Sequence, residues 1–251
     1  MPGASKPLPE EEPVIAQLER AGFKYERDWN GWGFYHLGDE ALAQIPRLNT
    51  IAFLNLFESC DAGRVTDEGV GHLAGNRSLV SLHLGPGVTD AGLGRLSGLT
   101  QLEELRLDSA EAVTDRGMEH VAALTNLEVL SVQYTQVGDR GLGRLAGLTR
   151  LKELVLCHTR VTNEGLEHLA EMSRLTALLL SDTGVTDAGV RRLAAFTGLE
   201  TLWLDGTRLS DAAIPTLAEL RRLTQLLVSR TAVTKKGVRA LTAALPQCRV
   251  S

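Results

Sequence analysis

The sequence predicts an α/β solenoid of about nine repeats, each built from one short strand and one helix. From Val113 onward a six-residue phrase returns every 24 residues, and a fixed period in this range is typical of solenoids. Within each period the leucines follow helical spacing first and strand spacing next. The phrase occurs as VTDEGV at Val65, VTDAGL at Val88, VTDRGM at Val113, VGDRGL at Val137, VTNEGL at Val161, VTDAGV at Val185, LSDAAI at Leu209 and VTKKGV at Val233.

The unit that begins at Val137 shows how one repeat is expected to fold. Leu142, Leu145 and Leu148 are spaced as one face of a helix, whereas Leu154 and Leu156 alternate as the buried residues of a strand. The stretch from Leu37 to Leu56 has the same layout in a degenerate form and predicts an opening repeat. The solenoid is therefore predicted to span residues 37–251.

Three positions of the repeat have expected structural roles. An Asp or Asn is predicted to cap the start of each helix, and a small residue two places later lets stacked turns approach closely. A Thr is predicted to end each strand and to bond the backbone of the turn. Lys235 replaces the capping residue in the last unit, as expected for a terminal repeat with no following neighbour. The acidic or amide residues are Asp67, Asp90, Asp115, Asp139, Asn163, Asp187 and Asp211, and the threonines are Thr135, Thr159, Thr183, Thr207 and Thr231.

The N-terminal part of the chain has a different pattern. Residues 1–10 are expected to form a disordered tail, and residues 11–36 a cap made of a helix over Pro13–Ala21 and a hairpin that turns at Asn30-Gly31. Eight aromatic residues gather between residues 23 and 57. We expect these aromatic residues to cover the open end of the solenoid core. The alternative is that they form an aromatic recognition patch. They are Phe23, Tyr25, Trp29, Trp32, Phe34, Tyr35, Phe53 and Phe57.

Composition argues against several classes of protein. A net charge of -5 disfavours nucleic-acid binding, which needs a positive surface. No apolar run approaches the ~20 residues that cross a bilayer, and the start of the chain lacks the pattern of a signal peptide, so we expect a cytoplasmic protein without membrane contact. The three cysteines form no CxxC pair, which predicts free thiols.

No sequence motif indicates an enzyme or a cofactor. Phosphate-binding loops and HExxH helices are absent from the sequence. The best candidate for chemistry is a set of strand-end residues that includes metal-ligating side chains, namely Cys157, His158, Ser181, Asp182 and Asp205. Because strand ends in repeats of this kind are ordinarily polar and solvated, we expect neither a metal nor catalysis there, and a metal-dependent enzyme is the less favoured alternative.

The repeats resemble the leucine-rich repeat family, in its strand-plus-helix subclass with the unit LxxLxLxxTxVTDxGLxxL. Similar units occur in F-box receptor subunits, in bacterial leucine-rich repeat proteins and, more distantly, in ribonuclease inhibitor. The resemblance covers Leu37 to Ser251. It implies a curved horseshoe with a parallel sheet on the concave face and helices on the convex face. It does not imply a partner, because the family is defined by its shape.

The strand positions that the core does not need are expected to line the concave face. In each unit we take the residue between the two buried strand positions, which gives Asn55, His83, Arg106, Ser131, Val155, Leu179, Trp203, Leu227 and Arg249. Four successive members are apolar, and we call Val155, Leu179, Trp203 and Leu227 the apolar stripe. Nearby polar residues, which we call the polar rim, are Tyr134, His158, Asp182, Asp205 and Arg230.

An apolar stripe beside polar groups is typical of a protein-binding surface. The sequence therefore predicts a non-enzymatic scaffold that binds a protein or peptide of unknown identity on its concave face. Two other readings stay open. The stripe can be strand-favouring composition without a partner, or it can mediate self-association of a structural protein. We expect a monomer or a weak homodimer.

Overall fold

The chain forms one continuous open sheet backed by short helices. The computed structural model describes residues 8–20, 25–27, 32–35, 38–45, 50–57 and 65–251. Within these residues strands β2 to β11 are parallel and follow each other in sequence order, and β1 pairs with β2 in an antiparallel hairpin. The strands are β1 Tyr25–Arg27, β2 Trp32–Tyr35, β3 Ile51–Asn55, β4 Ser81–His83, β5 Glu104–Arg106, β6 Val129–Ser131, β7 Glu153–Val155, β8 Ala177–Leu179, β9 Thr201–Trp203, β10 Gln225–Leu227 and β11 Arg249–Val250.

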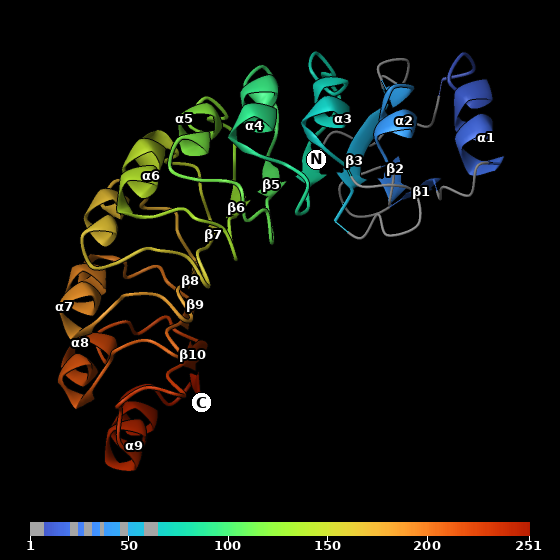
Figure 1. The fold of residues 1–251 in the computed structure, drawn as a ribbon. Coiled ribbons are helices and arrows are strands. Elements are labelled where there is room, and N and C mark those ends of the chain that lie inside the picture. Colours follow the sequence, from blue (N-terminus) through green and yellow to red (C-terminus); the bar gives the residue numbers. More distant parts are fainter. Residues whose placement is uncertain (1–7, 21–24, 28–31, 36–37, 46–49, 58–64) are drawn as a thin grey trace.

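Helices lie on the outer side of an arc whose inner side is the sheet (Figure 1). The α-helices are α1 Glu12–Arg20, α2 Asp39–Leu42, α3 Asp67–Gly71, α4 Asp90–Leu96, α5 Gly117–Val121, α6 Asp139–Arg144, α7 Asp187–Val190, α8 Ile214–Leu217 and α9 Lys235–Ala244. The 3₁₀ helices are η2 Leu145–Gly147, η3 Gly165–Leu169, η4 Arg191–Ala195 and η5 Asp211–Ala213. Neighbouring strands lie about 4.8 Å apart whereas packed helices need 8–10 Å, roughly, so stacking bends the sheet inward. The predicted horseshoe and its concave sheet are confirmed.

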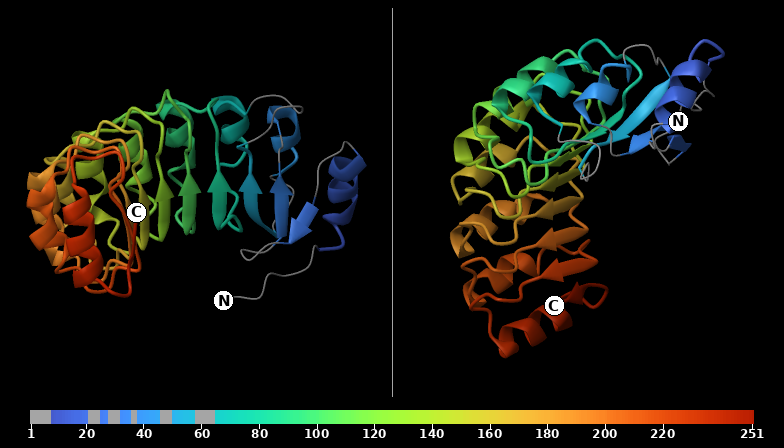
Figure 2. Two further views of the ribbon diagram at one scale, coloured as in Figure 1. Left: turned by 90° about the horizontal axis from the view of Figure 1, so that it is seen from below. Right: turned by 45° about the vertical axis from the view of Figure 1, so that its right-hand side comes forward.

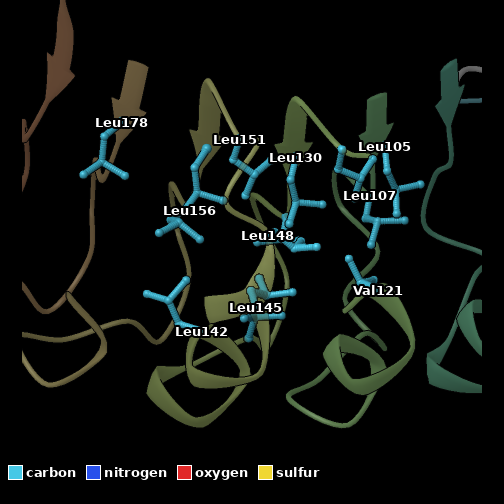
Figure 3. Packing of buried hydrophobic residues seen from close by; sticks show 14 of the residues in the cluster. Leu105, Leu107, Val121, Leu130, Leu142, Leu145, Leu148, Leu151, Leu156 and Leu178 are labelled. Atoms are coloured by element: carbon cyan, nitrogen blue, oxygen red, sulfur yellow. The ribbon is translucent and has the colours of Figure 1, made fainter. Parts of the chain in front are cut away.

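The core is a stack of leucine layers between sheet and helices. Leu142, Leu145 and Leu148 approach from the helical side, and Leu154 and Leu156 from the strand side, and all five are fully buried. Figure 3 shows the same arrangement across several turns, with Leu105, Leu130 and Leu178 reaching from β5, β6 and β8 toward the helices. Strands β3 to β11 correspond to the nine repeats expected from the sequence.

The aspartate of the repeated phrase connects one repeat to the next, and the prediction that it caps its own helix is wrong. The preceding Thr is the cap: Thr89 accepts a hydrogen bond from the Ala91 amide. The carboxylate of Asp67 instead accepts hydrogen bonds from the Thr89 amide at 2.8 Å and hydroxyl at 2.6 Å. Corresponding links join Asp39 to Thr66, Asp90 to Thr114, Asp115 to Gly138, Asp139 to Thr162, Asn163 to Thr186, Asp187 to Ser210 and Asp211 to Thr234.

The small residue of the phrase leaves room for this carboxylate, which confirms the expected close approach of the turns. A Cβ atom on Gly92 would lie 2.3 Å from Asp67 Oδ1, and one on Gly165 would lie 2.5 Å from Asp139 Oδ1. The Gly165 amide donates to that same Asp139 oxygen at 3.0 Å. Lys235 occupies the aspartate position of the repeat that begins at Val233.

The threonines at the strand ends have the role that the sequence predicted. Thr135 Oγ1 donates to the Val132 carbonyl at 2.6 Å, and Thr159 and Thr183 make the equivalent bond at 2.7 Å. Thr207 and Thr231 bond the carbonyls of Leu204 and Val228. Each hydroxyl therefore closes the turn that follows its own strand, whereas the aspartates connect different turns.

The N-terminal elements continue the sheet. Helix α1 begins one residue before the expected helix and buries Ile15 and Leu18. The fully buried Glu11 accepts hydrogen bonds from the Leu8 amide and from the amide and hydroxyl of Thr50, which fixes α1 against the start of β3. Among the eight N-terminal aromatic residues, the side chains of Phe34 and Phe53 are buried in the structure and that of Phe57 is exposed. The Asn30-Gly31 turn and most of the expected tail lie outside the described residues. Figure 2 shows the strands of this end aligned with those of the solenoid.

No helix in the described part of the chain is long and apolar enough to cross a membrane.

We expect Asp139→Ala to lower the free energy of unfolding by about 2 kcal/mol, because it leaves the amides of Thr162 and Gly165 and the Thr162 hydroxyl without their acceptor. Asp139→Asn is the matched control, since Asn163 already makes the same link to Thr186. Urea unfolding measures both values. Equal losses for the two variants would contradict a role based on hydrogen-bond geometry.

We expect Gly138→Thr to raise the free energy of unfolding by about 1 kcal/mol, because the hydroxyl supplies both a helix cap and the missing partner of Asp115. The Gly138 backbone is extended, as at the other caps, and a Cβ there meets its nearest neighbour at an ordinary 3.5 Å. Gly138→Ala serves as control, because it adds the Cβ without the hydroxyl. A gain no larger than that of the alanine variant would refute the interpretation.

Candidate functional site

The column predicted to line the concave face is in register across eight strands. The pairings place Asn55, His83, Arg106, Ser131, Val155, Leu179, Trp203 and Leu227 side by side from β3 to β10. The assignment of Arg249 to this column is wrong, because Arg249 pairs with Gln225 and therefore belongs to the flanking column. The 24-residue period continues to this end of the sheet, so the position one period after Leu227 is Ser251.

The apolar stripe is only partly open to solvent. Leu179, Trp203 and Leu227 are half-buried, but Val155 is only 4% exposed, so the expectation that it offers free surface is wrong. Its neighbour on β6, Ser131, is fully buried as well. The inward curvature crowds side chains on this face, and a short Val between neighbours is covered where the larger Trp203 and the two leucines are not. The accessible part of the stripe is therefore Leu179, Trp203 and Leu227.

Trp203 is central to this accessible part. Leu179 lies beside it on β8 and Leu227 on β10. Its indole Nε1 is buried and has no hydrogen-bond partner among the described residues. A buried donor without a partner costs about 1–3 kcal/mol, so the ring is held by its apolar contacts and not by a polar one.

The other half of the concave face carries a charge network, which we call the Glu104 network, that sequence reasoning did not identify. Glu104 is 3% exposed and accepts hydrogen bonds from Ser81 at 2.8 Å and from Arg106 Nε at 2.7 Å, and His83 Nε2 lies 3.2 Å from it. Arg106 also reaches across β6 to Glu153 at 3.3 Å. The signal in the sequence was a Glu and an Arg two residues apart on one strand, which places both side chains on the same face.

The Glu104 network sets the ionisation of its central carboxylate. Burial alone would raise the pKa of Glu104, but hydrogen bonds from His83, Arg106 and Ser81 outweigh it and lower the pKa to about 2. The carboxylate is therefore ionised at neutral pH and satisfied within the protein. The charged groups of this half of the concave face bind one another, whereas the half that carries Trp203 presents apolar side chains.

The structure brings all five residues of the polar rim together in one continuous chain of contacts. The rings of Tyr134 and His158 stack at 4.2 Å with an interplanar angle of 12°. His158 Nε2 lies 3.3 Å from Asp182 Oδ2, and Arg230 binds both Asp182 oxygens at 2.9 and 2.7 Å. Arg230 also donates to Asp205 at 2.6 Å, which together with a hydrogen bond from Ser181 lowers the pKa of Asp205 against the effect of burial.

The rim residues project outward because the chain turns into the left-handed region at the end of each strand. Tyr134, His158, Asp182 and Arg230 have φ of 57°, 54°, 55° and 54°. Gly206 occupies the equivalent place at 68°, and a Cβ on it would lie 2.2 Å from Asp182 Oδ1. The glycine therefore lets the ion pair between Asp182 and Arg230 cross the intervening turn. In the sequence, the glycine at this position of the repeat was the available indication of a left-handed turn.

The alternative metal site at the strand ends lacks the required geometry. Within the described ranges no group of three or more His, Cys, Asp or Glu side chains is placed to hold an ion. Cys157 is buried, and that burial raises the pKa of its thiol, while His158 is exposed and stacks on Tyr134. These two consecutive side chains therefore lie in different environments, one buried and one exposed.

Comparisons with known proteins agree with this architecture. The family model described as Leucine Rich repeat matches residues 123–146, and no curated protein matches the chain significantly. Among solved structures, internalin InlC2 of Listeria monocytogenes is similar with a TM-score of 0.64 and 24% identity over 100% of this chain and 99% of that chain.

Two further solved structures have the same fold at lower similarity. Internalin InlF of Listeria monocytogenes has a TM-score of 0.53 and 24% identity over 83% of this chain and 69% of that chain. A leucine-rich repeat protein of Leptospira interrogans has a TM-score of 0.52 and 15% identity over 83% of this chain and 56% of that chain.

We expect the stability of the protein to fall as the pH drops from 4.5 toward 2, because the pKa of Glu104 is lower in the folded chain than in the unfolded one. The ionised carboxylate stabilises the fold fully above the unfolded pKa, and that contribution, roughly 3 kcal/mol, is lost as protonation proceeds. Glu104→Gln should therefore destabilise at pH 7 and lose this acid dependence.

Urea unfolding at a series of pH values measures the effect. The matched control is Glu103→Gln, at the exposed neighbouring position. If Glu104→Gln keeps the same fall in stability below pH 4.5 as the unmodified chain, the network does not have the energetic role described here.

Proposed function

We propose that the chain, which has the fold of leucine-rich repeat proteins and matches their family model over residues 123–146, acts as a non-enzymatic scaffold that binds a protein or peptide on its concave face. The observation that carries this proposal is the row of half-buried Leu179, Trp203 and Leu227 in register on β8, β9 and β10. Binding sites commonly place a Trp at the centre of an apolar patch with polar groups around it. The polar rim supplies such groups along the adjacent edge.

The contrast between the two halves of the concave face supports the position of the proposed site. In the Glu104 network, the charged groups bind one another, so a partner must replace or share these bonds in order to bind them. The stripe instead presents apolar surface whose burial is favourable at about 25 cal/mol per Å². A partner that covers Trp203 and its two neighbours would gain a few kcal/mol from this contact, as expected for an anchor within a larger interface.

The polar rim is suited to set the orientation of a bound partner and adds little to the affinity for that partner. Asp182, Asp205 and Arg230 already pair among themselves, so a partner gains little by replacing these bonds. Tyr134 differs because it is 46% exposed and its ring is held in place by the stack on His158. A rigid exposed ring beside an apolar stripe gives a partner a second contact point.

We expect Trp203→Ala combined with Leu179→Ser to remove proteins that the unmodified chain retains from a lysate of its source organism, as read by mass spectrometry. A candidate partner, once purified, should bind the double variant at least about tenfold more weakly, because a central Trp contributes more than 1.4 kcal/mol at such sites. Circular dichroism checks that the fold is kept.

The matched control is His120→Ala, which changes an exposed residue on the convex side. If the double variant and the unmodified chain retain the same proteins, the concave site is refuted. Light scattering of the double variant and of the unmodified chain tests for self-association. A dimer that the double variant abolishes would identify the partner as a second copy of the chain.

A further inference from the structure

A second surface feature lies where the strands connect to the helices of two adjacent repeats. Four arginines and two acidic residues line a shallow depression there: Arg116, Arg140, Arg144, Arg160, Asp115 and Glu119. The six residues carry a net charge of +2, in a chain whose net charge is -5. This depression is separate from the apolar stripe, and its interpretation does not rest on the proposed function.

The arginines of the depression differ in their pairing. Arg144 binds Glu119 at 3.0 Å, so this pair is neutral. Arg116, Arg140 and Arg160 are exposed and make no ion pair with any residue that the structure describes. Asp115 is engaged by the Gly138 amide at 2.7 Å. Three guanidinium groups are thus available around one hollow, against one carboxylate.

The repeat itself does not require these arginines. Arg116 and Arg140 hold the same place in consecutive repeats, between the aspartate and the glycine of the phrase. Other repeats have Glu68, Ala91, Glu164, Ala188, Ala212 and Lys236 there. Gly138 forms a backbone bridge with Arg160, which brings that side chain next to the other two. The missing side chain at Gly138 keeps the space between them open.

We propose that this depression binds a phosphoryl group, presented either on a phosphorylated peptide or as a free phosphate ion. Guanidinium groups match the geometry of phosphate oxygens and form charge-assisted hydrogen bonds to them. A dianion also offsets the excess positive charge of the three unpaired arginines. Because the chain as a whole is acidic, general attraction of anions does not account for binding at this place.

Phosphorus NMR titration of inorganic phosphate at constant ionic strength tests the site. We expect Arg140→Gln and Arg160→Gln each to weaken binding by about tenfold. The matched control is Arg208→Gln: Arg208 occupies the same repeat position as Arg160, but Glu164 and Ala188 stand where Arg116 and Arg140 accompany Arg160. Binding by the Arg208→Gln variant should stay within about twofold of the unmodified chain.

Asp115→Asn gives a test of opposite sign. It removes the carboxylate charge from the depression and keeps an oxygen for the Gly138 amide, so phosphate should bind severalfold more tightly. Loss of binding in Arg140→Gln and Arg208→Gln to the same extent would overturn the proposal, as would no phosphate response at all. A serine-phosphorylated peptide and its unphosphorylated form distinguish the sources. A peptide that binds more tightly than inorganic phosphate, and only when phosphorylated, identifies a protein ligand.

Discussion

The fold depends on a side-chain link that each repeat makes to the next. Backbone pairing joins the strands on the concave side, apolar packing joins the helices to the sheet, and single backbone bridges join the connections between them. There the carboxylate of one repeat holds the amide and hydroxyl of the next helix cap, as Asp67 does for Thr89. One residue type thus satisfies groups that a short helix would leave without partners. The aspartate and the threonine of the repeated phrase are the residues that form this link.

Because the link, the core leucines and the strand-end threonines use fixed positions, the remaining positions are free to vary. The two halves of the concave face show what variation produces. Around Glu104 the free positions carry charges that bind one another, and around Trp203 they carry apolar side chains with a polar edge. The arginines near Gly138 occupy other free positions on the strand-to-helix connections. The solenoid therefore separates the residues that fold it from those that are free to form a binding surface.

The repeat architecture, the nine solenoid strands and the register of the concave column from β3 to β10 were predictable from the sequence, because period and alternation determine which side chains face inward. The role of the repeated aspartate was not, since a helix-start acceptor can cap its own helix or reach a neighbour, and only the stacking distance decides between them. Burial of Val155 was also unpredictable, because it depends on curvature and on the size of its neighbours. The rim contacts depend on left-handed turns, which only Gly206 indicated in the sequence.

Gly138 alters one of these side-chain links between repeats. The Asp115 side chain holds this repeat through the Gly138 amide alone, whereas the equivalent side chains Asp90 and Asp139 also bind a hydroxyl. On the opposite side of the same boundary, Arg106 spans from β5 to β7 and holds three strands together. The ion pair thus crosses the boundary between β6 and β7, where the link on the strand-to-helix connections lacks the hydroxyl.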